Sequence, residues 1–303
     1  MQDPTLLYEL RSEADLGAPV LIEALGGFVD AGHGIQLACN HVLGTFASEI
    51  VAAFEVDELV DYRSRRPMLI FDTDHWDAYA EPSLTLHSLR DANGTAFLLL
   101  AGPEPDLQWE RFVAALAILV DALGVRLTMG LHAVPWAAPH TRPLGISAHG
   151  HPLDLPIGPP VGIGRVQIPA SAGQLLQYRL VDAGRDAIGL AAHVPHYLAL
   201  AEYPDSALTL LEGVERVAEL SLGLEPLRSS AAAVRAEIDA QVRNDEETAA
   251  AIRSLEENYD ELERQGAGPA GETLPTGDQL GAAFERFLAE RQRQSEEDER
   301  PGG

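Results

Sequence analysis

The chain has 303 residues, of which 46% are hydrophobic, and a formal net charge of −26 at pH 7. This length and composition allow a sizeable buried core and exclude wholesale disorder. So strong a negative charge argues against nucleic acid or an anionic membrane as the main partner.

The chain offers no feature of a secreted or membrane-spanning protein. Cys39 is its one cysteine, so no intramolecular disulfide can form. The first residues lack the basic and apolar regions of a signal peptide, and no apolar run approaches the roughly 20 residues that span a bilayer. We therefore expect a cytoplasmic protein.

The first two-thirds of the chain alternate strand-like and helix-like segments. Asn93-Gly94 predicts a tight hairpin turn, and Asp106, Ser171 and Pro204 are predicted to start helices. The predicted strands cover 20–25, 49–56, 68–72, 83–90, 95–101, 125–134 and 187–193. The predicted helices cover 34–46, 107–123, 171–182 and 204–220.

Strands separated by single helices favour a mainly parallel sheet that is covered on both faces. The hairpin adds an antiparallel pair, so the predicted fold class is α/β with a mixed, mainly parallel sheet flanked by helices. We divide the chain into an α/β core, 1–225, and a helical C-terminal extension, 226–303, with a frayed acidic tail. Asn244 and Glu247 have capping-box spacing, which predicts a helix break there, and 277–294 is predicted to form the last helix.

A glycine-rich loop covers residues 26–34, between a predicted strand and a predicted helix. Exposed amides at Gly27 and Gly32 could hold an anion at the start of the helix. The spacing matches neither a Walker A loop nor a dinucleotide fingerprint, and no lysine follows. The other interpretation is a tight strand-to-helix turn with Asp30 at the helix entry. Both stay open.

Three further patterns are incomplete as catalytic or metal-binding signatures. Gly145 to Gly150 resembles a nucleophile elbow around Ser147, but His149 replaces the second glycine and no triad context surrounds it. None of the ten histidines repeats a metal signature, and Pro195 keeps its neighbouring histidines off one helical face. Carboxylates at 55–61 fit acid–base chemistry or a solvated strand end.

Several phrases together resemble the proteasome assembly chaperone family of the second type (PAC2), in its actinobacterial branch. The phrases are Gly26-Gly-Phe-Val-Asp-Ala-Gly32, the segment 57–67, Gly102-Pro-Glu-Pro-Asp-Leu-Gln-Trp109, Pro139-His-Thr-Arg-Pro143, Ala192-His-Val-Pro-His-Tyr197 and the segment 277–287. The resemblance implies a phosphorylase/hydrolase-like α/β fold, a homo-oligomer (with a trimer as a guess at the number), and protein partners such as proteasome subunits. It implies neither enzymatic activity nor a cofactor. Some members dock through a hydrophobic-Tyr-x tail, whereas this chain ends Glu-Arg-Pro-Gly-Gly.

The leading hypothesis is therefore a non-enzymatic, oligomeric assembly or scaffold protein with no metal site, although catalysis stays open. The alternative is a small-molecule-binding enzyme or sensor that uses the 26–34 loop, with its site at the C-terminal ends of the parallel strands. The arginine cluster at 63–66 either serves that site or pairs with neighbouring carboxylates. The candidate ligand-binding residues are Gly27, Asp30, Gly32, Arg63, Arg65, Thr141, Arg142 and His193.

Overall fold

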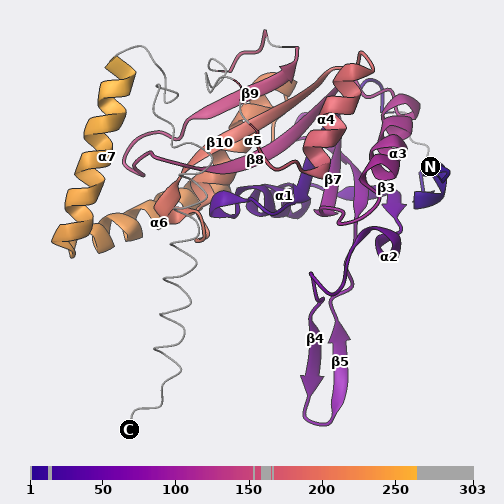
Figure 1. The fold of residues 1–303 in the computed structure, drawn as a ribbon, viewed down its shortest axis with the longest axis horizontal. Helices are drawn as coiled ribbons and strands as arrows, with labels where there is room; N and C mark the ends of the chain where they lie inside the picture. Colours follow the sequence, from indigo (N-terminus) through magenta and orange to yellow (C-terminus); the bar gives the residue numbers. More distant parts are fainter. Residues whose placement is uncertain (1, 13–15, 153, 158–164, 166, 265–303) are drawn as a thin grey trace.

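An eight-stranded mixed sheet forms the centre of the protein (Figure 1). The computed structural model describes residues 2–12, 16–152, 154–157, 165 and 167–264. The strand order is β1-β3-β6-β7-β2-β8-β10-β9. Strands β7, β2, β8 and β10 run parallel to one another, and the remaining pairs are antiparallel. The strands of this sheet are β1 (Tyr8–Leu10), β2 (Val20–Gly26), β3 (Ser48–Phe54), β6 (Thr85–Arg90), β7 (Ala96–Pro103), β8 (Leu127–Trp136), β9 (Ile146–His151) and β10 (Ala187–Pro195).

Helices cover both faces of the sheet, as predicted for its mostly apolar central strands. Helices α1 and α5 pack on one face and share a core with residues such as Ile22, Met129 and Leu190. Helices α3 and α4 pack on the other face, against Leu21 and Leu98. The helices are α1 (Gly34–Thr45), α2 (Val56–Leu59), α3 (Trp109–Ala122), α4 (Ala172–Asp182), α5 (Pro204–Ala218), α6 (Glu225–Arg243) and α7 (Glu246–Arg264), with short 3-10 turns η1 (Pro4–Leu7), η2 (Ala31–His33) and η3 (His196–Leu198).

The structure confirms those predicted helix starts that rest on a capping residue or a proline next to the helix. Ser171 forms a complete capping box with Gln174 at the start of α4, and Pro204 occupies the first position of α5. The expected break near Asn244 separates α6 from α7. The prediction that Asp106 caps a helix is wrong, because Gln108 is the residue that precedes α3. The Asp106 carboxylate instead accepts the main-chain N–H of Asp61.

A two-stranded hairpin projects away from the body (Figure 1). It is formed by β4 (Leu69–Asp72) and β5 (His75–Tyr79), which pair only with each other. Every residue of both strands is exposed. The sequence predicted the first strand but not the second.

The region after β8 differs most from expectation. The segment read as a possible nucleophile elbow forms β9, an edge strand antiparallel to β10. Helix α6 continues the core through Leu227, with Val234 and Ile238 packed beside it. The last predicted helix, 277–294, lies outside the described residues. None of the described helices has the length and apolar character needed to cross a membrane.

Candidate functional site

The glycine-rich loop turns the chain from the C-terminal end of β2 into η2 and α1. The Asp30 carboxylate accepts the N–H groups of Ile35 (2.7 Å) and Gln36 (3.1 Å) in the first turn of α1. A helix N-terminus attracts negative charge, and here a side chain of the loop itself occupies that position. This geometry matches the interpretation of a tight turn with Asp30 at the helix entry.

Main-chain hydrogen bonds of Gly32 hold the loop against the segment between β10 and α5. Its backbone has φ +67°, a conformation that glycine adopts without strain. Its N–H donates to the Ala199 carbonyl at 2.8 Å, and its carbonyl accepts the N–H of Tyr203 at 3.0 Å. A Cβ at this position would lie 3.0 Å from the Tyr203 Cβ. Close packing and backbone conformation therefore both explain why a glycine occupies position 32.

The two candidate arginines lie in different surroundings. Arg65 donates to the Glu104 carbonyl at 2.7 Å and forms an ion pair with Asp106 at 3.1 Å, next to the glycine-rich loop. The Arg63 side chain is 89% exposed and pairs with Asp61. Both arginines thus pair with carboxylates of their own neighbourhood, and only Arg65 approaches the loop.

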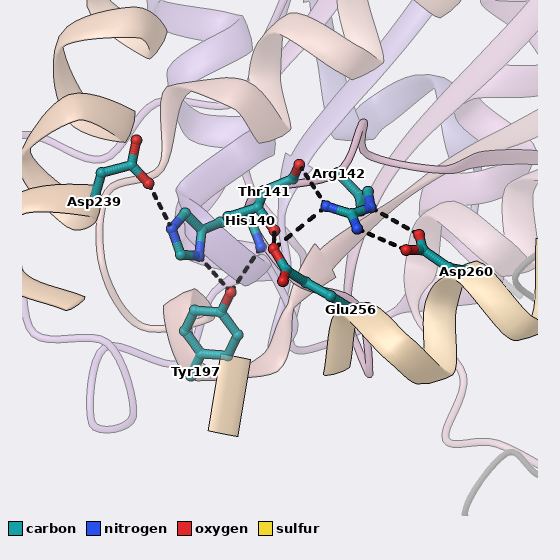
Figure 2. A network of polar contacts seen from close by, with 7 residues as sticks. All are labelled: His140, Thr141, Arg142, Tyr197, Asp239, Glu256 and Asp260. Carbon is teal, nitrogen blue, oxygen red and sulfur yellow. Dashed lines mark hydrogen bonds and ion pairs between the residues drawn. The ribbon is translucent and has the colours of Figure 1, made fainter. Parts of the chain in front are cut away.

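Thr141 and Arg142 attach helix α7 to the loop after β8 (Figure 2). The Arg142 guanidinium donates to both carboxylate oxygens of Asp260, at 2.8 and 2.7 Å, and to Glu256 at 3.3 Å. The Thr141 hydroxyl also donates to Glu256. The bonds to Asp260 raise the pKa of the Arg142 guanidinium. These contacts hold α7 against the loop.

His140 makes a second attachment in the same network (Figure 2). Its ring nitrogens lie 2.7 Å from the Tyr197 hydroxyl and 3.2 Å from the Asp239 carboxylate. The His140 side chain is 1% exposed, whereas that of Asp239 is 46% exposed. The histidine therefore joins η3 to α6 at the point where the loop after β8 meets both.

His193 lies apart from these groups, on the sheet face that α3 and α4 cover. Its Nε2 is 3.1 Å from the Ser147 hydroxyl, and its ring stacks on Trp136 at 4.2 Å between centroids. Burial lowers the pKa of His193 to about 4, so the ring is neutral at pH 7. Its Nδ1 has no hydrogen-bond partner among the described residues, so the third member of a Ser-His-acid triad is missing there.

The same face holds a row of titratable side chains that the sequence analysis did not single out: buried Glu23 and Glu104, half-buried His132 and exposed His149. Glu23 and Glu104 are 4% and 5% exposed. The two histidine rings stack at 5.6 Å.

Glycines make room for this polar row. A Cβ at Gly130 would lie 2.9 Å from the Glu23 carboxylate, and one at Gly189 would lie 2.3 Å from the His149 ring. A glutamate inside a strand that is otherwise apolar, and single glycines inside neighbouring strands, were the available signals.

Burial shifts the pKa of each member of the row that shows a resolved change. It raises the pKa of Glu23 to about 7, although a hydrogen bond from the Leu25 N–H lowers that pKa and the charge of Glu104 raises it further. Burial, aided by His149, lowers the pKa of His132 to about 4. Burial also lowers the pKa of His149. Both histidine rings are therefore neutral at pH 7, and Glu23 is partly protonated there.

The candidate residues are thus distributed over three places: the glycine-rich loop with Arg65, the α7 attachment, and the buried sheet face. They do not form one constellation, and their role in ligand binding stays a prediction. Within the described part of the chain, no three histidine, cysteine or acidic side chains are arranged to hold a metal ion.

The fold and these sites define a class of protein: a three-layer α/β protein with a mixed sheet, a projecting hairpin and C-terminal helices bound to the loop after β8. A family model described as the PAC2 family matches residues 24–242, more than half of the chain. The chain belongs to this family. None of the curated proteins matches it.

Solved structures from actinobacteria support this assignment. The protein of unknown function Rv2714 from Mycobacterium tuberculosis is 46% identical, with 88% of this chain and 94% of that chain covered and a TM-score of 0.82. A protein of unknown function from Corynebacterium glutamicum is 36% identical, with 86% and 98% covered and a TM-score of 0.81. The Mycobacterium tuberculosis proteasome-assembly chaperone homologue Rv2125 is 25% identical, with 77% and 99% covered and a TM-score of 0.69.

Proposed function

We propose that this protein is a non-enzymatic, oligomeric assembly or scaffold protein of the cytoplasm that acts by surface recognition, as a chaperone does. Its membership of the PAC2 family and its likeness to a proteasome-assembly chaperone homologue support this role. They make proteasome subunits the partner class to test first.

The projecting hairpin is the observation that carries the proposal. Six large apolar side chains lie exposed on it or at its base: Met68 (74%), Leu69 (43%), Ile70 (56%), Phe71 (57%), Trp76 (64%) and Tyr79 (52%). An isolated two-stranded hairpin is marginally stable in water, and clustered exposed apolar side chains mark protein interaction sites. The hairpin therefore fits a segment that is completed by another protein surface.

A second copy of this chain is the occupant we propose for the hairpin. Fully burying one large apolar side chain stabilises by roughly 1.5–3 kcal/mol, so burying half of this set gives on the order of 5 kcal/mol before the entropic cost of association. The net charge of −26 opposes self-association at long range. The hairpin itself carries Asp72, Asp74 and Asp77, so its apolar contacts must outweigh this repulsion.

The test is the molar mass in solution, measured by size-exclusion chromatography with light scattering. We expect the wild-type chain to be an oligomer, for which three subunits is the number to examine first. The double variant Phe71→Ser/Trp76→Ser, which removes an aromatic pair with centroids 5.0 Å apart, should be monomeric with unchanged circular dichroism. The matched control Asp74→Ser, in the hairpin turn, should remain oligomeric. A monomeric wild type at micromolar concentration would refute the oligomer.

The partner is tested separately with purified proteasome α-subunits. Immobilised wild-type protein should retain free α-subunits, and adding it to them should accelerate their assembly. An oligomer that neither binds the subunits nor changes their assembly would remove the proteasome from the proposal and leave the scaffold role without its first partner.

A small-molecule site is the second candidate, favoured by this row of titratable groups, in which the pKa values of Glu23, His132 and His149 are shifted. Glu104 connects this row to the glycine-rich loop, because a Cβ at Gly27 would lie 3.1 Å from its carboxylate. Thermal-shift measurements with nucleotides, nucleosides and inorganic phosphate test it. Stabilisation that is abolished in His132→Ala, a change within this row, would favour this candidate, and no shift with any of them would count against it.

A further inference from the structure

The first turn of α4 rests on two buried carboxyl groups. The Glu104 carboxylate accepts the N–H of Ala172 at 2.6 Å. The Glu23 carboxyl lies directly beneath the next residue, since a Cβ at Gly173 would come within 2.5 Å of its Oε2. No cationic side chain of the described chain forms an ion pair with either glutamate. The first turn of α4 therefore packs against two carboxyl groups that form no ion pair with a basic side chain in the described residues.

This arrangement favours one negative charge and opposes two. The positive end of a helix stabilises an adjacent anion, and Glu104 already occupies that position. A second buried charge beside it meets like-charge repulsion and loses its hydration. Half-buried His132 lies next to Glu23 over Gly130, and its lowered pKa makes it a poor base; His149, beside His132 and exposed, also has a lowered pKa. The guanidinium of Arg65 donates to the main-chain carbonyl of Glu104 and pairs with Asp106.

The face that α4 turns to the glutamates carries no charge. Ala172, Gly173 and Leu176 are its buried residues in this region. The charged Arg179 of the same helix is bound to Glu110 on α3, away from the glutamates. No basic side chain that the structure describes neutralises the second glutamate. Its negative charge is therefore avoided when one of the two carboxyl groups binds a proton.

We propose that α4 is held on the sheet by a proton-dependent latch, seated while the Glu23 and Glu104 pair retains a proton and loosened at its first turn when the pair releases it. The sign follows from the direction of the shift: burial raises the pKa of Glu23 from its ordinary value to about 7. A raised pKa means that the seated state binds the proton more tightly than the loosened state. The seated state is therefore most favoured below about pH 4.5, weakens as pH rises from there to about 7, and changes little above that.

Loosening would uncover a specific part of the sheet. Gln177 of α4 donates to the His149 carbonyl at 3.0 Å and so connects the helix to the edge strand β9. Buried Glu23 and half-buried His132 lie beneath the same helix. The latch therefore couples proton release to exposure of these two side chains. It stands independently of the oligomer proposed above.

Hydrogen–deuterium exchange of the peptide that covers α4, corrected for the intrinsic effect of pH on exchange, tests the latch. Between the pKa of a solvated glutamate and that of seated Glu23, each pH unit raises the opening equilibrium up to tenfold, so the opening of α4 should increase on the order of tenfold between pH 5.5 and pH 7 and level off above about pH 8. Helix α3, on the same face, serves as the internal reference and should not change. In Glu23→Gln, which stays neutral, the increase should disappear.

Two further variants keep the outcome decisive. Glu49→Gln, at an exposed position of β3, should behave as the wild type. Glu104→Gln keeps an oxygen for the Ala172 N–H but removes the neighbouring charge, so the pH effect should become smaller. This variant serves as the test if Glu23→Gln does not fold. Exchange in α4 that is independent of pH in the wild type, or equally dependent in Glu104→Gln, would overturn the latch.

Discussion

Replacing Asp30 tests whether the carboxylate at the start of α1 is a structural cap. Its two oxygens accept the N–H groups of Ile35 and Gln36. Asp30→Ala removes both acceptors and leaves two N–H groups at the start of a 12-residue helix without them. Asp30→Asn keeps one side-chain oxygen in the same place and removes the charge.

The expected loss for Asp30→Ala is about 1–2 kcal/mol in the free energy of unfolding, the range of N-terminal capping groups. Burial raises the pKa of Asp30, and the helix N–H groups only partly oppose that increase. The charge of the carboxylate therefore adds little net stability at pH 7, and most of the loss comes from the hydrogen bonds. Asp30→Asn should cost less than half as much as Asp30→Ala.

Urea unfolding at pH 7, followed by circular dichroism at one protein concentration, gives these free energies. The ratio of the two losses is the informative quantity, because both variants share any change in the oligomer. An Asp30→Ala variant as stable as the wild type would refute the cap. Equal losses for the two variants would show that the charge, rather than the hydrogen bonds, stabilises the helix start.

Three other substitutions follow from close packing and from the attachment of peripheral segments. Gly173→Ala places a methyl group against the Glu23 carboxyl and should lower the thermal midpoint, with a cost of about 1–3 kcal/mol from overpacking. Arg111→Ala removes a 5% exposed side chain that binds the N-terminal segment and α2 and should cost about 2–3 kcal/mol in urea unfolding. Arg142→Ala should increase deuterium exchange in α7 and leave exchange in α3 unchanged, whereas the control Arg253→Ala should change neither. Because salt screens ion pairs, 1 M salt should also increase deuterium exchange in α7 of the wild type.

Local signals predicted most of the architecture. The capping box of Ser171, the proline at the start of α5 and the Asn93-Gly94 turn depend on neighbouring residues, so the sequence displays them directly. The apolar runs of β2 and β10 predicted central strands because such runs are buried on both faces. These features were sufficient for the mixed sheet and for the helices on its two faces.

The strands β5 and β9 were missed because their own residues show little strand pattern. The segment that forms β9 has few strand formers, and its pairing with β10 places it in the sheet. β5 contains His75 and Asp77 among its five residues and pairs only with β4. Pairing of this kind, between segments separated along the chain or within an exposed hairpin, leaves no strong periodic pattern in one sequence.

The same distinction explains the candidate residues. Asp30 was placed correctly at the helix entry because the glycine-rich loop and the helix adjoin in sequence. Arg142 and His193 were expected to meet that loop, but Arg142 contacts α7 and His193 contacts Ser147. Which strand end approaches which loop is decided by the sheet order, which the sequence does not state.

The buried glutamate at the centre of the sheet has an energetic consequence that bears on function. A pKa raised from 4.5 to about 7 corresponds to on the order of 3 kcal/mol of stability lost when Glu23 is ionised in the folded protein. A glutamine or an apolar residue over Gly130 would avoid this loss at every pH. A fold stabilised only by packing would gain nothing from an acid there, whereas a fold that must loosen α4 in response to pH would. The proton-dependent exchange of α4 separates these two explanations, because a merely tolerated acid lowers global stability with pH without acting first on that one helix.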